Sequence, residues 1–175
     1  GHTFAGWSPA VPAAQGAADA TYTAQWTVNQ YTVTYANTGD ATIAAVTADY
    51  GTAIAPVADP TWEGYSFTGW KWTNAEGAEI FAPATVPAYN VTATAQWKAN
   101  SYTIEWIVDG TTVAANAHDF GADVTVPAAP EKAGYTFAGW HTKSDFSDAE
   151  VTQIAKGSTG NKTLYAQWDA IHTVT

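Results

Sequence analysis

Short stretches in which large apolar side chains alternate with polar ones recur along the chain. In residues 31–35 the side chains of Tyr31, Val33 and Tyr35 are separated by threonines, and residues 102–106 show a similar alternation. A period of two is typical of a strand with one buried face. We therefore predict a strand in each of these two stretches.

A turn and a returning strand are expected after each of these strands. A glycine lies within Asn37–Asp40, and another follows Asp109 directly. Glycine adopts the positive φ of a tight turn without steric cost, so Asp-Gly between alternating runs indicates a hairpin. The returning strands are predicted near Thr42–Val46 and Thr111–Ala115.

Two short motifs recur at nearly constant spacing. A glycine–aromatic motif, Gly-x-x-Phe-x-Gly-Trp, and an Ala-Gln-Trp motif are each predicted to lie on a strand. The glycine before the tryptophan of the first motif indicates either a β-bulge or a ring packed over that glycine. The first motif occupies residues 1–7, 64–70 and 134–140, and the second occupies residues 24–26, 95–97 and 166–168.

This spacing of 71 residues between successive Ala-Gln-Trp motifs indicates tandem repeats. We predict a partial repeat over residues 1–26, full repeats over 27–97 and 98–168, and the start of a further repeat over 169–175. Because residues 1–26 lack the front half of a repeat, they are expected to pack on the next repeat. Alternatively, they take up a strand from residues 169–175 of another copy.

The segment between the two motifs differs most among the repeats. In the third copy, residues 147–150 form a capping box and Gly157 is a stop signal, so a short helix is predicted over residues 148–156. Pro60 and Pro130 each precede the glycine–aromatic motif, where one helical turn or a plain turn would fit. The predicted fold is mostly β, with short strands, hairpins and at most a short helix per repeat.

Aromatic rings are the main candidates for the core. The chain has nine Trp, nine Tyr and six Phe, while Ala and Thr dominate the remainder. Each buried ring removes a large apolar area from water. The predicted structural core consists of the rings that recur in the two full repeats: Phe67, Trp70, Trp97, Phe137, Trp140 and Trp168.

The charge balance narrows the range of partners. Sixteen acidic residues face six lysines and no arginine, which gives a formal net charge of −10. Nucleic acids and anionic membrane surfaces require a basic patch, so neither is expected as a partner. The absence of Cys excludes disulfides and cysteine metal sites. No apolar run is long enough for membrane insertion, and no signal peptide is present.

The combination of motifs resembles the Listeria–Bacteroides repeat, also found as the B repeat of internalin-type surface proteins. The resemblance covers residues 29–97 and 100–168 fully and residues 1–26 in part. It implies small β-grasp-like domains in tandem, within secreted or wall-attached bacterial proteins, and no catalytic residues. Gln replaces the usual Lys of the Ala-Gln-Trp motif, and the chain is far more acidic than most members, which disfavours polyanion binding.

No catalytic, cofactor or metal site is predicted. The four histidines lack metal-ligand spacing, and no nucleophile elbow or phosphate loop is present. Asp145, Asp148 and Glu150 offer the oxygen ligands that Ca²⁺ prefers, but their spacing differs from that of an EF-hand. A helix N-terminus explains two of them better. Asn90 and Asn161 fit the glycosylation pattern, but Asp19 holds the same place in the first copy, so a turn role explains all three residues and glycosylation only two.

Trp62 and Trp72 do not recur and are candidates for stacking against sugar rings; extra packing between repeats is the alternative. The short connectors Thr27–Gln30 and Lys98–Ser101 are expected to allow little movement between neighbours. The sequence therefore predicts a non-catalytic stalk, spacer and adhesion scaffold at the bacterial cell surface or cell wall. The second hypothesis is a module that binds carbohydrate or mucin, with a host or cell-surface glycan or protein as partner.

Overall fold

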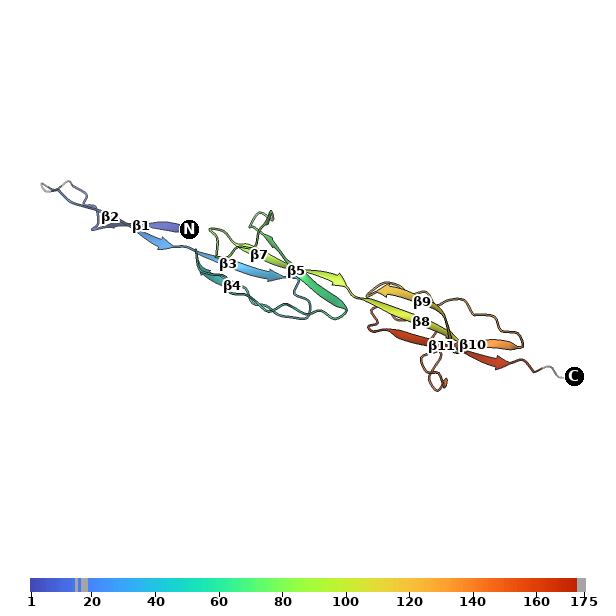
Figure 1. Ribbon diagram of the computed structural model, residues 1–175. Helices are drawn as coiled ribbons and strands as arrows, with labels where there is room; N and C mark the ends of the chain where they lie inside the picture. The colour runs from blue at the N-terminus through green and yellow to red at the C-terminus, as the bar shows by residue number, and fades with distance from the viewer. Residues whose placement is uncertain (15, 17–18, 173–175) are drawn as a thin grey trace. The chain divides into compact units, whose positions relative to one another are not determined.

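The computed structural model describes residues 1–14, 16 and 19–172, and the prediction of a mostly β fold is confirmed (Figure 1). The described residues contain no helix that could cross a membrane. The strands form a two-stranded sheet, a five-stranded sheet of order β4-β3-β7-β5-β6 and a four-stranded sheet of order β10-β11-β8-β9. Their bounds are β1 (His2–Ser8), β2 (Thr23–Val28), β3 (Gln30–Ala36), β4 (Val46–Asp49), β5 (Tyr65–Thr73), β6 (Glu79–Ile80), β7 (Val91–Ala99), β8 (Ser101–Val108), β9 (Thr111–Asp119), β10 (Tyr135–His141) and β11 (Lys162–Ala170).

The chain divides into two compact units. The first consists of Gly1–Glu63 and Phe67–Trp97, and the second consists of Gly64–Ser66 together with the residues from Lys98 onward. The first unit thus holds the partial copy and the first full repeat. The second unit holds the last repeat and also includes the beginning of β5.

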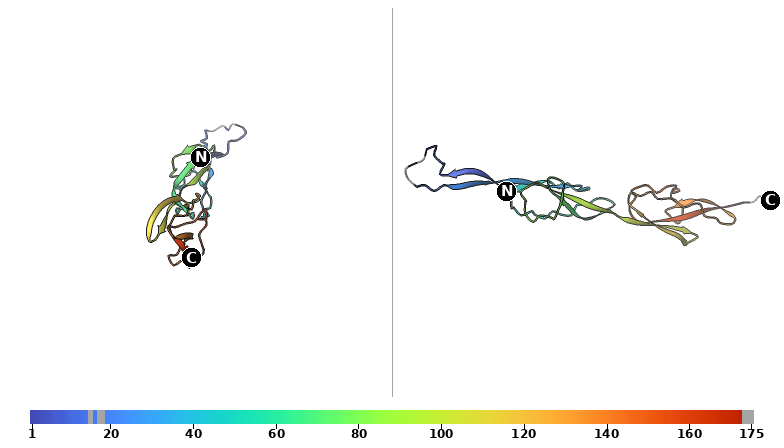
Figure 2. Two further views of the ribbon diagram at one scale, coloured as in Figure 1. Left: turned by 90° about the vertical axis from the view of Figure 1, so that its right-hand side faces the viewer. Right: turned by 90° about the horizontal axis from the view of Figure 1, so that it is seen from above.

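In both full repeats, the opening strand lies parallel to the closing strand, as the ribbon views show (Figure 1 and Figure 2). On β3 and β7, Val33 lies opposite Val91, and on β8 and β11, Trp106 lies opposite Leu164. All four side chains are at most 2% exposed. This central parallel pair therefore provides the most deeply buried positions of each repeat.

An asparagine just before the closing strand fixes the start of this parallel pair. Asn90 Oδ1 accepts a hydrogen bond of 2.9 Å from the backbone amide of Thr32, and Asn161 Oδ1 accepts the equivalent bond from Thr103, also at 2.9 Å. A side-chain oxygen thus satisfies an amide of the opening strand. Both asparagines thus connect the start of the closing strand to the opening strand.

The core is more aliphatic than the sequence indicated. Of the six rings predicted as core, Trp140 is 3% exposed, whereas the other five are only partly buried. The buried face of the parallel pair explains this difference, because it points Val33, Ile104 and Leu164 inward, while Thr34 and Glu105 on the other face stay exposed. The buried clusters are Val33, Val86 and Val91 in the first full repeat, and Ile104, Trp106, Trp140, Ile154, Leu164 and Ala166 in the last repeat.

The partial copy forms only the antiparallel hairpin of β1 and β2. Its three recurring rings are largely exposed, at 46% for Phe4, 48% for Trp7 and 60% for Trp26, because this copy lacks a parallel strand pair to cover them. The hairpin pairs within its own chain. Residues 173–175 lie outside the described residues, and strand exchange between copies stays a prediction.

The predicted β-bulge is present in the glycine–aromatic motif. The register shifts between Phe137 and Gly139, and likewise between Phe4 and Gly6. The glycine takes a φ of 128° at Gly6 and Gly139 and 133° at Gly69, a conformation that other residues rarely adopt. The extra residue turns the strand locally, so side chains three positions apart reach the same face.

The helix predicted over residues 148–156 is wrong. This segment is irregular, and Ile154 forms an isolated bridge with Val124. The carboxylate of Asp148, which was expected at the N-terminus of this helix, instead accepts hydrogen bonds from the amide and the hydroxyl of Thr142. This carboxylate therefore stabilises the end of β10 and does not stabilise a helix.

The returning strand predicted near Thr42–Val46 is also misplaced, because β4 begins only at Val46. After the turn, the Asp40 amide donates to the carbonyl of Thr61 over 2.8 Å, so the chain first runs along the segment before the glycine–aromatic motif. In the last repeat the Asp109-Gly110 turn leads directly into β9, as predicted.

The bulge glycine provides a first test. Gly69→Ala should lower the free energy of unfolding by about 1–3 kcal/mol, because alanine at this φ is strained. A Cβ at Gly69 would meet no atom within 4 Å, so the cost is confined to the backbone. Urea unfolding followed by tryptophan fluorescence measures the change. The neighbouring exposed Thr68→Ala is the control and should change stability by less than about 0.5 kcal/mol. Equal stability of both variants would contradict a required bulge.

Candidate functional site

Each glycine–aromatic motif forms an aromatic triad with the tryptophan of the closing strand. In the first full repeat, Phe67 lies 5.3 Å from Trp70 and 5.6 Å from Trp97, measured between ring centroids, and both contacts are edge-to-face. Contacts of this kind contribute about 0.5–1.5 kcal/mol beyond the burial of area. The same triad recurs in the partial copy, with Phe4, Trp7 and Trp26, and in the last repeat, with Phe137, Trp140 and Trp168.

Trp62 extends the triad of the first full repeat toward the surface. Its ring lies 5.6 Å from that of Trp97 at an interplanar angle of 81°, and the residue is 36% exposed. In the last repeat Lys132 occupies the corresponding place, with Nζ 5.5 Å from the ring of Trp168. The position beside the triad is thus occupied by an aromatic ring in the first full repeat and by a lysine in the last repeat. Both fit there, because a cation near an indole is also attracted to it.

Trp72 has a different environment. It packs against the buried cluster of Val33, Val86 and Val91, and its ring lies 6.5 Å from that of Tyr35. Tyr35 in turn contacts Trp70, so Trp62 and Trp72 are the two ends of one continuous chain of edge-to-face rings. Trp62 and Trp72 are therefore connected through packed rings. Sugar binding by these two residues stays a prediction.

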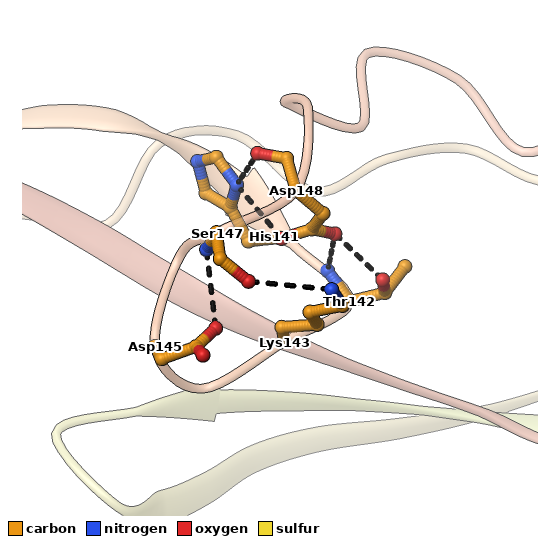
Figure 3. Close-up of polar contacts among 6 residues, drawn as sticks. All are labelled: His141, Thr142, Lys143, Asp145, Ser147 and Asp148. Atoms are coloured by element: carbon orange, nitrogen blue, oxygen red, sulfur yellow. Dashed lines mark hydrogen bonds and ion pairs between the residues drawn. The ribbon is translucent and has the colours of Figure 1, made fainter.

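A polar cluster at the end of β10 contains two of the three acidic residues that were considered for Ca²⁺, Asp145 and Asp148 (Figure 3). Asp148 Oδ2 accepts hydrogen bonds of 2.8 Å from the Thr142 amide and 2.6 Å from its hydroxyl, and Oδ1 lies 3.3 Å from His141 Nδ1. Asp145 Oδ1 accepts a bond of 3.1 Å from the Ser147 amide. Both carboxylates therefore stabilise the loop by accepting hydrogen bonds from backbone amides of nearby residues.

These contacts determine what the cluster can do chemically. The Thr142 hydroxyl donates to a carboxylate, and His141 Nδ1 faces the carboxylate and the carbonyl of Asp148. Among residues 1–14, 16 and 19–172, no group of three His, Asp or Glu side chains is placed to hold a metal ion. The cluster acts as a structural clamp on the loop.

The connectors contain residues whose role the sequence reasoning missed. Asn29 and Asn100 each stand alone between two strands, β2 and β3 or β7 and β8. The Asn29 amide donates to the carbonyl of Gly1 over 2.9 Å, and its carbonyl accepts from the Tyr50 amide over 2.8 Å. The Asn100 amide donates to Gly64, and its carbonyl accepts from Phe120, at the same distances. Recurrence of Asn at a step of 71 residues was the available signal.

An aromatic ring also packs at each of these two connectors. We call the connector asparagine, its two backbone hydrogen bonds and this ring an asparagine joint. Phe120 lies 5.2 Å from Tyr65, and a Cβ added to Gly64 would stand only 2.3 Å from the Phe120 ring. Tyr50 covers Gly1 in the same way and contacts His2 at 5.8 Å. In these two copies the first glycine of the motif is therefore required for the close approach of a ring, whereas a Cβ at Gly134 would meet no atom within 4 Å.

The Asp148 clamp predicts a dependence of stability on pH. The hydrogen bond from the Thr142 hydroxyl is the main cause that lowers the pKa of Asp148 from 3.8 to about 2. A lowered pKa means that this carboxylate stabilises the fold above about pH 4 and loses its contribution as the pH falls toward 2. The gap in urea midpoint between the parent and Asp148→Asn should shrink over this range.

Thr142→Val is the matched second variant for the clamp. Removing the hydroxyl should raise the pKa of Asp148 and move the acid loss of stability to higher pH. An unchanged gap between the parent and Asp148→Asn from pH 5 to pH 2 would contradict the role of the clamp.

Comparison with known proteins agrees with this architecture. The family model of the Listeria-Bacteroides repeat domain matches residues 31–96 and again residues 102–167. These matches contain the paired residues of the parallel strands and the glycine–aromatic motif of both repeats, and each ends one residue before the tryptophan that completes the triad.

Three relatives show similarity to most of the chain. A candidate Gly-rich membrane protein of Evansella cellulosilytica is 29% identical over 97% of the chain and 21% of its own length, and a candidate membrane protein of the same organism is 33% identical over 83% and 22%. Internalin H of Listeria monocytogenes is 38% identical over 62% of the chain and 20% of its own length. The chain spans about a fifth of these relatives, and it belongs to the Listeria-Bacteroides repeat family.

Proposed function

We propose that this chain is a non-catalytic, semi-rigid spacer in a bacterial surface protein, where it positions an adhesive or other domain. The observation that carries the proposal is the asparagine joint, which occurs at Asn29 and again at Asn100 with the same hydrogen bonds and the same ring-on-glycine contact. A joint held by two backbone hydrogen bonds and an aromatic contact resists bending more than a free linker does.

Location at the cell surface is supported by the relatives. Internalin H and the two candidate membrane proteins share this repeat, and the chain makes up about a fifth of each of them. The acidic surface, with a net charge of −10, favours a solvated, self-repelling segment.

The joint can be tested by a distance measurement in the full chain, which has no cysteine of its own. Spin labels at Ala44→Cys and Thr112→Cys, both exposed positions, lie on either side of Asn100. The parent should give a narrow distance distribution. Phe120→Ala should broaden it, because the ring no longer covers Gly64. Electron–electron double resonance measures both distributions.

Phe81→Ala is the matched control for this experiment, because Phe81 is 97% exposed and its loss should leave the distribution unchanged. A broad distribution in the parent, or no effect of Phe120→Ala in a folded protein, would contradict the spacer. Urea unfolding checks that both variants remain folded.

A second candidate function is binding of a host or cell-surface glycan at Trp62, favoured by the 36% exposure of this indole on a chain of packed rings. Stacking of a sugar on an aromatic face would require it to stay accessible. Trp62→Ala and Trp72→Ala should each reduce binding to a mucin glycan array, while Phe81→Ala should not. Identical array profiles for the parent and both tryptophan variants would exclude this candidate.

A further inference from the structure

The first full repeat encloses an apolar cavity that the last repeat fills with its own side chain. The cavity has a volume of about 170 Å³ and lies between β3, β4 and the segment of residues 52–57. Val33 and Val86, which are 1% and 2% exposed, form buried parts of its wall. It reaches the surface beside Val46, which is 50% exposed.

At the corresponding position of its opening strand, the last repeat has the indole of Trp106. Trp106 follows Tyr35 by 71 residues, and both lie two positions beyond the central apolar residue of the opening strand. Trp106 Nε1 donates to Asn116 Oδ1 over 3.1 Å. Asn116 lies opposite Ile104, and Val46 lies opposite Val33, so Asn116 and Val46 occupy equivalent positions in the two repeats. Because the Trp106 indole reaches Asn116, it extends toward the place that Val46 occupies in the first full repeat.

Neighbouring side chains support the same correspondence. Val124 packs against the Trp106 cluster, and Ile54, which stands at the same distance after the aromatic-Gly turn, lines the cavity. Trp106 is 1% exposed, so the last repeat closes this space with an indole. The first full repeat has Tyr35 at that position, and its single phenol ring is smaller than the two fused rings of an indole.

We infer that this cavity is a binding site for a small, flat, uncharged aromatic compound about the size of one benzene ring. An apolar cavity of roughly 150 Å³ stays dry and accepts benzene, because water inside it would lack hydrogen-bond partners. The occupant would replace the missing part of the indole. Val46 stands in place of Asn116, so the wall has lost the acceptor that an indole N–H uses.

The charge of the ligand follows from the walls. The lining consists of aliphatic side chains together with Tyr35 and Thr52 and contains no lysine. A carboxylate in this cavity would be desolvated without a cationic partner, which is costly. Toluene should therefore bind, whereas benzoate of similar ring size should not.

The full chain, labelled with ¹⁵N, can be titrated with toluene and observed by heteronuclear NMR. Saturable shifts should appear at amides of β4 and of residues 52–57, and benzoate should cause none. Tyr35→Trp combined with Val46→Asn introduces the Trp and Asn that the last repeat has at these two positions. The added indole should fill the cavity and abolish the shifts. If toluene causes no saturable shifts in the parent, or if benzoate binds there equally, the inference is overturned.

Two further variants make the result independent of one substitution. Ala48→Leu fills the cavity from β4, where the last repeat has the larger His118, and should also abolish binding. The reciprocal change, Trp106→Tyr with Asn116→Val, should add a second toluene site in the last repeat and leave the first intact. Undiminished binding in a folded, filled variant would place toluene elsewhere and refute the site.

Discussion

The edge-to-face contact between Phe and Trp within each glycine–aromatic motif exists because the strand between them carries one extra residue. In a regular strand, side chains three positions apart point to opposite faces. The bulge at Gly69 and its equivalents turns Phe67 and Trp70 onto one face, where Trp97 of the closing strand meets them. The closing strand is thereby set beside the opening strand, and the buried parallel pair depends on this placement.

On this common plan, the two full repeats fill their interiors differently. Tyr35 and Val46 of one repeat correspond to Trp106 and Asn116 of the other, so an apolar gap stands where an indole forms a hydrogen bond. At the margin, Trp62 takes the place of Lys132 beside the triad. The segment after the motif also differs. The first full repeat extends β5 and pairs it with β6, whereas the last repeat ends β10 at His141 and holds the following loop with Asp148.

Periodicity was sufficient to locate most strands, since alternation and the repeated motifs report directly on backbone geometry. It failed where a side chain had two competing partners. Asp148 fits a helix cap by sequence, yet a threonine six residues earlier offers two donors in the folded chain. The depth of burial was also missed, because the predicted core contained only the recurring rings, whereas the parallel pairs bury Val33, Ile104 and Leu164 together with Trp106. The asparagine joints could have been found, since Asn29 and Asn100 recur at the same step as the motifs.

The position of Gly64–Ser66 has a thermodynamic consequence. These residues begin β5, a strand of the five-stranded sheet, yet they belong to the compact unit of the last repeat through Asn100 and Phe120. A substitution in this short segment should therefore lower the stability of the last repeat, although the segment opens the glycine–aromatic motif of the repeat before it. The thermodynamic boundary thus lies within β5 and does not coincide with the boundary of the sequence repeat.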